Sequence, residues 1–334
     1  MSAFFPDITP FNSGRFETGD GHELFWQECG NPAGIPLLFL HGGPGSGCSP
    51  KYRRVFDPQR FRILMLDQRG AGQSRPVASL EHNTTAHLID DLEILRDTLG
   101  LNRWIVYGPS WGSTLALAYA QAHPERISGL VVQAVFLGTE SELNWWHSPD
   151  GLQRFFPDAW DAFISPVPIP ARESATNVMD WYLDVMRAEQ AAGYPLLANL
   201  ATASLDELRR SAVYRWTEYE DRTSYLENSP QEVLESLRER GADYIASHSL
   251  IEAHYFQNRC FLKPDQLIQD AHRLADIPMA ILHSRYDMVC PPQSAFRLAA
   301  ACPHADFRLV PVNGHGMTET TQAVLREIMS GFEG

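Results

Sequence analysis

The chain has 334 residues and a formal net charge of −14, and 44% of its residues are hydrophobic. This length can bury one large core, and the balance of hydrophobic and charged residues is that of a globular protein. The negative charge argues against binding to nucleic acid, which needs clustered Lys and Arg, and against binding to an anionic membrane surface.

Cysteine usage and the N-terminal residues bear on the cellular compartment. The five cysteines, at positions 29, 48, 260, 290 and 302, are odd in number and form no C-x-x-C pair. We therefore expect free thiols in a reducing compartment. The first residues, MSAFFPDITPFNSGRF, lack the basic and apolar regions of a secretory signal, and no apolar run approaches the ~18 residues of a membrane helix. These features predict a soluble, cytoplasmic protein.

The first part of the chain alternates between short apolar runs and helical patterns. Strands are expected at 23–29, 36–43, 61–70, 103–108 and 127–136, with helices at 83–100 and directly after Ser110. Asn83 or Thr84 can cap the first helix, and Gly100 can end it. Strands that alternate with helices predict a mostly parallel α/β sheet.

The pattern changes near residue 138, where helical segments rich in aromatic and charged residues replace the strand series until about residue 272. Strands return at 277–287 and 306–316, and a last helix runs to the C-terminus. We therefore predict an α/β core made of residues 1–138 and 273–334, with a helical cap inserted at 139–272.

The segment VYGPSWGSTLALAYA places Ser110 between Gly108 and Gly112, after an apolar run and before a helical one. The G-x-S-x-G spacing is typical of a sharp strand-to-helix turn that exposes a serine hydroxyl. On its own the spacing is also common in turns without a catalytic role. Its position between strand and helix makes Ser110 the candidate nucleophile.

A serine nucleophile needs a histidine base and an acid that orients it. Asp287 and His315 follow the two last predicted strands, in the chain order that α/β hydrolases use. Asp276 and Asp306 are weaker candidates for the acid, since neither follows a strand. His283 and His304 are weaker candidates for the base.

An oxyanion hole needs two backbone N–H groups near the nucleophile. Trp111, the residue after Ser110, supplies one, and the loop HGGPGSG (41–47) supplies the other, with Gly43 as the candidate. The loop DQRGAGQS (67–74) is expected to shape the floor of the pocket. HSLIEAH (248–254) lacks the H-E-x-x-H spacing of a zinc site, so we predict no metal site and no cofactor.

Several motifs together resemble the proline iminopeptidases, serine peptidases with the α/β-hydrolase fold. The core carries FLHGGPGSG, LDQRGAGQS, GPSWGSTLALAYAQAHPE, HSRYDMVCP and GHG, and the helical segment carries ELNWWH, RWTEYED and LIEAHYFQN. The resemblance extends from about residue 5 to the end of the chain. It implies a serine aminopeptidase that releases an N-terminal proline from peptides through an acyl-enzyme on Ser110.

The resemblance also implies that two glutamates of the cap bind the free amino group of the substrate, and their motifs match Glu220 and Glu252. A charged terminus needs opposite charge, and two carboxylates can pair with a secondary ammonium. The alternative for Glu220 is a solvated helix face, whereas Glu252 has apolar and aromatic neighbours in the sequence.

The chain departs from the family pattern at four positions. Pro109 and Ser284 stand where Gly is usual, Gly316 stands where Ser is usual, and Gln133 stands where an arginine is usual. None of these changes removes a candidate catalytic residue. They bear on the strictness of the preference for proline.

Three classes of function fit these observations. The first is a prolyl aminopeptidase acting on small peptides with a free N-terminal proline. The second is an esterase or amidase on the same fold, for which two buried carboxylates would have no use. The third is a non-catalytic binding protein, which would not need Ser110, Asp287 and His315 together.

Overall fold

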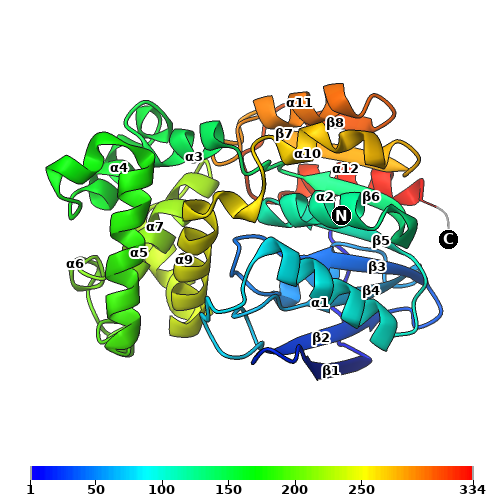
Figure 1. Ribbon diagram of the computed structural model, residues 1–334, viewed down its shortest axis with the longest axis horizontal. Coiled ribbons are helices and arrows are strands. Elements are labelled where there is room, and N and C mark those ends of the chain that lie inside the picture. The colour runs from blue at the N-terminus through cyan, green and yellow to red at the C-terminus, as the bar shows by residue number, and fades with distance from the viewer. Residues whose placement is uncertain (1, 333–334) are drawn as a thin grey trace.

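Eight strands form one sheet in the computed structural model, which describes residues 2–332 (Figure 1). Their spatial order is β1-β2-β4-β3-β5-β6-β7-β8. The strands are β1 (Asn12–Glu17), β2 (Glu23–Gly30), β3 (Ile35–Leu40), β4 (Phe61–Leu66), β5 (Trp104–Pro109), β6 (Ile127–Gln133), β7 (Met279–Ser284) and β8 (Asp306–Val310).

The sheet is parallel from β4 to β8, and β2 is antiparallel to both of its neighbours. This confirms the predicted mostly parallel α/β sheet. Strand β1 was not predicted, because its sequence NSGRFE has one apolar side chain and lies largely exposed. This strand forms because it pairs with β2 at the edge of the sheet, and not because of a hydrophobic pattern.

Side chains that alternate along the strands pack into two hydrophobic layers, one on each face of the sheet. Leu38 and Leu40 of β3 face helices α1 and α2, while Leu37 and Phe39 face α12. The helices of the core are α1 (Thr85–Thr98), α2 (Trp111–Ala122), α11 (Gln293–Ala301) and α12 (Glu319–Ser330). The two layers hold the ends of the parallel strands in fixed positions.

Helix α1 begins as predicted after Thr84, whose hydroxyl accepts a hydrogen bond from the backbone N–H of His87. Asn83, the alternative cap, instead donates its side-chain amide to the carbonyls of Arg69 and Ser79. It ties the loop after β4 to the start of this helix.

A group of helices lies between β6 and β7 and stands beside the sheet on the left of Figure 1. They are α3 (Glu140–His147), α4 (Pro157–Ile164), α5 (Ala175–Ala191), α6 (Leu205–Leu208), α7 (Ala212–Ser224), α8 (Pro230–Arg240) and α9 (Ala242–Gln257). We call this group the helical cap, and its predicted limits, 139–272, stay a prediction. Helix α10 (Gln266–Gln269) follows the group and packs on α2 of the core.

Aromatic rings fill the interior of the helical cap. Phe163 stacks on Tyr182 and Tyr219, with ring centroids 4.5 and 4.4 Å apart. The ring of Trp216 packs edge-on against Phe163 and Tyr182. Such pairs add to the free energy gained by burial. The cap therefore holds α7 and α9, which face the core, in a rigid arrangement.

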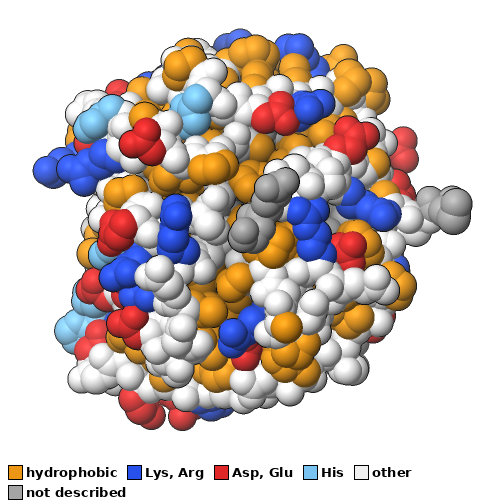
Figure 2. All heavy atoms as spheres, turned by 90° about the vertical axis from the view of Figure 1, so that its right-hand side faces the viewer, with side chains coloured by type: hydrophobic (Ala, Val, Ile, Leu, Met, Phe, Trp, Pro, Cys, Tyr) orange, Lys and Arg blue, Asp and Glu red, His pale blue; other side chains and the backbone are white. Residues whose placement is uncertain are grey.

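Short 3-10 helices connect several of these elements: η1 (Pro50–Arg54), η2 (Pro124–Arg126), η3 (Leu152–Arg154), η4 (Ile169–Glu173), η5 (Leu197–Asn199), η6 (Arg259–Phe261) and η7 (Ala271–Leu274). Figure 2 shows the face on the far side from the cap, where acidic and basic side chains are interspersed with hydrophobic ones. Within residues 2–332, none of the helices has both the length and the apolar character needed to cross a membrane.

Candidate active site

Ser110 occupies the turn between β5 and α2 with a φ of 56° and a ψ of −128°. This is a backbone conformation that residues with a side chain rarely adopt. Gly108 and Gly112 make the turn possible: a Cβ on Gly108 would lie 2.0 Å from the carbonyl oxygen of Gly112, and one on Gly112 would lie 2.2 Å from that of Leu40. The two glycines let strand and helix approach closely and leave the Ser110 hydroxyl at the turn.

The structure brings His315 and Asp287 to this hydroxyl. His315 Nε2 lies 3.1 Å from Ser110 Oγ, and its Nδ1 lies 2.8 Å from Asp287 Oδ2 and 3.0 Å from Oδ1. The backbone N–H groups of Val289 and Cys290 donate to Asp287 Oδ1 at 3.1 and 2.8 Å. These two N–H groups thus fix the Asp287 carboxylate, and the His315 imidazole lies between this carboxylate and the Ser110 hydroxyl.

The electrostatic environment suits a histidine that accepts a proton. Burial acts to lower the pKa of His315, but the adjacent Asp287 carboxylate outweighs burial and raises it above the ordinary value. The same carboxylate would stabilise the imidazolium that would form if His315 accepted the proton of Ser110.

The weaker candidates from the sequence lie elsewhere. Asp276, Asp306 and His304 are exposed to solvent. His283 is buried near Asp287, but its Nδ1 accepts from the backbone N–H of Val135 and its Nε2 lies 3.0 Å from the carbonyl oxygen of Cys290. Its ring therefore holds β7 to the segment after β6.

The loop 41–47 lies against the serine. A Cβ on Gly42 would be 3.5 Å from Ser110 Cβ, and the next residue, Gly43, has a φ of 102°. Trp111 is the first residue of α2, so its N–H is outside the helical hydrogen-bond ladder. Both proposed oxyanion donors, Gly43 and Trp111, thus flank the Ser110 turn.

Gln68, in the loop DQRGAGQS, ties these two segments together. Its side chain donates to the carbonyl of His41 at 2.9 Å and accepts from the indole N–H of Trp111 at 2.9 Å, and its backbone N–H donates to His41 Nε2 at 3.0 Å. We expected this loop to shape the pocket floor. None of its residues lines the two hollows at Ser110. The contacts of Gln68 instead fix the loop 41–47 relative to Trp111.

Two hollows meet at Ser110. The smaller one lies between core and cap and has mostly apolar walls. Its walls are formed by Phe136, Leu143, Trp146, Phe256, Val289 and Cys290. The larger one is a groove on the other side of Ser110 that His315 and Glu220 also line.

Glu220, on α7, and Glu252, on α9, both line the smaller hollow beside Ser110. The Trp216 indole donates to Glu252 Oε2 at 2.6 Å. Burial raises the pKa of Glu252 well above its usual range, and the neighbouring Glu220 charge adds to this. Burial acts in the same direction on Glu220, but the facing His248 outweighs it, and the pKa of Glu220 lies below its usual range.

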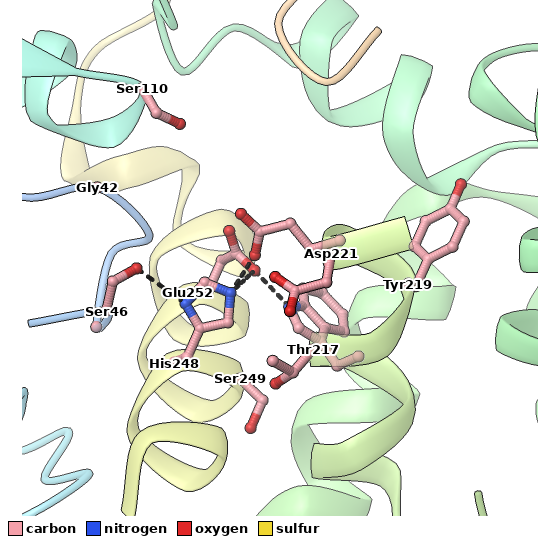
Figure 3. Close-up of polar contacts among 12 residues, drawn as sticks. Gly42, Ser46, Ser110, Thr217, Tyr219, Asp221, His248, Ser249 and Glu252 are labelled. Atoms are coloured by element: carbon pink, nitrogen blue, oxygen red, sulfur yellow. Dashed lines mark hydrogen bonds and ion pairs between the residues drawn. The ribbon is translucent and has the colours of Figure 1, made fainter. Parts of the chain in front are cut away.

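Sequence analysis missed His248, which was considered only as part of a zinc motif. The His248 ring is hydrogen-bonded through Nε2 to Glu220, and its Nδ1 lies 3.2 Å from Ser46 Oγ (Figure 3). A signal was present: His248 and Glu252 are four residues apart and share one face of a helix. The partner Glu220 comes from another helix, so no local spacing could reveal the full contact.

Three groups of side chains have donor atoms close enough to hold a metal ion. Two of them coincide with the groups described above: Glu220 with His248 and Glu252, and Asp287 with Cys290 and His315. The third, Asp20 with His82 and His87, lies on the surface of the core. In the first two groups His315 pairs with Asp287 and His248 pairs with Glu220, and serine-based acyl transfer uses no metal.

Two of the four departures from the family pattern have local consequences. Gln133 accepts a hydrogen bond from the Tyr107 hydroxyl at 2.7 Å, and its backbone carbonyl accepts from the N–H of Ser110 at 2.9 Å. At Gly316, a Cβ would lie 2.5 Å from the ring of Tyr225. Glycine beside His315 therefore allows this ring, which follows α7, to pack against the histidine loop.

Comparisons with known proteins place this arrangement in a family. The family model described as alpha/beta hydrolase fold matches residues 35–320. A proline iminopeptidase of Xylella fastidiosa is 41% identical, with 96% of this chain and 95% of that protein covered. The proline iminopeptidase of Arabidopsis thaliana is 37% identical, with 94% and 78% covered.

Solved structures are similar in fold. A proline iminopeptidase-related protein of Thermus thermophilus superimposes with a TM-score of 0.59 at 20% identity, covering 96% of this chain and 98% of that one. An esterase of Exiguobacterium antarcticum gives a TM-score of 0.61 at 15% identity, with 98% and 100% covered. With its sheet, its serine turn and its full-length relatives, the chain belongs to the proline iminopeptidase family of α/β hydrolases.

Proposed function

We propose that this protein is a serine aminopeptidase that releases an N-terminal proline from peptides. The observation that carries the proposal is the hydrogen-bonded set of Ser110, His315 and Asp287 beside a hollow lined by the buried Glu252 and the largely buried Glu220. The names of the relatives agree with this activity.

In the first half of the reaction, His315 Nε2 accepts the proton of Ser110 as the oxygen attacks the carbonyl carbon of proline. The N–H groups of Trp111 and Gly43 bind the oxyanion, and each such donor contributes roughly 3–4 kcal/mol to the transition state. Asp287 stabilises the imidazolium. His315 then gives its proton to the leaving amine, and prolyl-Ser110 remains.

In the second half, water replaces the leaving peptide. His315 accepts a proton from this water, which attacks the acyl-enzyme, and then returns the proton to Ser110 Oγ as proline is released. The groove on the far side of Ser110 gives the leaving peptide a path out and the water a path in.

Recognition of the free terminus falls to Glu220 and Glu252. They line the same hollow as the rings of Phe136, Trp146 and Phe256, so the carboxylates can pair with the ammonium while these rings contact the pyrrolidine ring. A longer chain on the amino side would have to pass the cap. The two carboxylates therefore support an exopeptidase rather than an esterase or an endopeptidase.

The substrate preference gives the first test. We expect fast hydrolysis of proline p-nitroanilide, and slow hydrolysis of alanine p-nitroanilide, N-acetyl-proline p-nitroanilide and p-nitrophenyl acetate. Acetylation removes the positive charge that the carboxylates need. Rates for the four substrates measured side by side would contradict the proposal if the ester were the best substrate.

Replacing Glu220 by glutamine is expected to lower kcat/KM for proline p-nitroanilide about 100- to 1000-fold, because it removes one partner of a buried charge pair. The exposed Glu235 on α8 offers the matched control, since Glu235→Gln should leave kcat/KM unchanged. Steady-state kinetics with both variants measure this. An equal loss on N-acetyl-proline p-nitroanilide would show that Glu220 does not bind the amine.

We also propose a cytoplasmic location. All five cysteines are free thiols, four of them buried. This supports a reducing compartment.

A further inference from the structure

His248 connects the core to the carboxylates of the cap. It lies on α9 one turn before Glu252 and is 1% exposed. In Figure 3 its ring lies between Ser46, from the loop 41–47, and Glu252. The ring also stacks on Tyr244, with centroids 5.3 Å apart and planes at 11°. These contacts fix the ring in position and orientation.

The contact with Glu220 requires a hydrogen on His248 Nε2, because a carboxylate oxygen only accepts. Ser46 can donate its hydroxyl to His248 Nδ1, over 3.2 Å. Nε2 then carries a hydrogen and donates it to Glu220. Glu252 Oε2 is farther from Nε2, at 3.8 Å, and takes its hydrogen bond from Trp216 instead. The two carboxylates therefore have different donors.

We propose that His248 is a positioning residue for amine recognition, which holds Glu220 as an anion aimed into the hollow beside Ser110. This inference rests on the proposed role of Glu220 in binding the substrate ammonium. Two carboxylates that share a buried site cannot both remain ionised without a compensating donor. His248 compensates Glu220, so one negative charge faces the single positive charge of the substrate.

Other charged groups near the ring do not provide this compensation. Arg240, next to Tyr244, pairs with Asp221. Burial lowers the pKa of His41, so this ring is neutral at neutral pH. His315 acts on Glu220 from the catalytic side, where Asp287 already pairs with it. Among the described residues, His248 is the largest contributor to the lowered pKa of Glu220, and His315 and the facing Glu252 add less.

The test compares His248→Leu, which removes the donor, with His248→Gln, which keeps an amide N–H at similar reach. For His248→Leu we expect KM for proline p-nitroanilide to rise about ten- to a hundredfold, the range for a buried hydrogen bond to a charged group. We expect kcat to change far less. The ratio of kcat/KM for proline p-nitroanilide to that for p-nitrophenyl acetate should fall by a similar factor.

The pH profile distinguishes positioning from packing. Without the donor, the pKa of Glu220 rises, so Glu220 takes a proton at a higher pH and the acid limb of kcat/KM moves upward. In His248→Gln, KM should be close to that of the unaltered protein, and the acid limb of kcat/KM should lie close to its original pH. Ser46→Ala, which removes the hydroxyl that contacts His248 Nδ1, should also move the acid limb to higher pH, but by less than His248→Leu does.

His254, on the same helix, supplies the matched control, because its Nε2 contacts the carbonyl of Asn83 away from the site. His254→Gln should leave the substrate ratio unchanged. The proposal is overturned if His248→Leu lowers both activities equally, or if the acid limb of His248→Leu stays where it is in the unaltered protein. If the unaltered protein does not prefer free over acetylated proline, the proposed function itself fails, whatever the His248 variants do.

Discussion

Ser110→Ala is expected to lower kcat for proline p-nitroanilide by about 10⁶-fold, the scale seen when a serine nucleophile is removed. The hydroxyl oxygen that would form the acyl-enzyme is lost, while His315 and Asp287 remain in place. Initial rates at saturating substrate measure the loss. A fluorophosphonate probe should label the unaltered protein at Ser110 and leave Ser110→Ala unlabelled.

The strained backbone at residue 110 offers a control for this result. With a φ of 56°, the position costs more for alanine than for glycine. Ser110→Gly should therefore unfold with a free energy about 1 kcal/mol higher than Ser110→Ala, while both are inactive. Activity that survives in both variants would mean that another residue is the nucleophile.

Asp287→Asn is expected to lower kcat about 10⁴-fold, because an asparagine holds the imidazole in the wrong tautomer. The same change removes the charge that raises the pKa of His315. A histidine base works in its neutral form, so activity is lost as the pH falls through its pKa. The residual activity of Asp287→Asn should consequently persist to lower pH than that of the unaltered protein.

The sequence offers two matched carboxylates for comparison. Asp276 and Asp306 are exposed, and Asp306 bonds only to Arg308 at 2.7 Å among the described residues. Asp276→Asn and Asp306→Asn should keep kcat and its pH profile. If one of them lost as much activity as Asp287→Asn, the assignment of the acid would be wrong.

Local patterns made the core of the site predictable. The tight turn at Ser110 requires glycine at positions 108 and 112, because a Cβ at either position would clash with backbone atoms. The turn can therefore be predicted from a few neighbouring residues. Asp287 and His315 each follow a predicted strand, and the ends of parallel strands meet at one edge of a sheet. Their meeting with Ser110 follows from the strand order.

Tertiary contacts explain what the sequence did not reveal. Glu218, two residues before Glu220 on α7, is 2% exposed and accepts hydrogen bonds from Arg209, a partner that no sequence pattern indicated. Gln68 and His248 act through partners that lie on other segments, such as Trp111 and Glu220. When the partner of a polar residue is distant in the sequence, no regular spacing relates the two residues, so only the folded structure shows that they are in contact.

The order of the site residues along the chain has a consequence for biosynthesis. Ser110 is made early, the glutamates of the cap follow, and His315 comes from the loop before the last helix. A chain that is still growing on the ribosome therefore has Ser110 before it has His315. A chain that stopped after Asp287 would lack His315 and would also lack β8 and α12, whose side chains cover one face of the sheet, so we expect it to be both inactive and unstable.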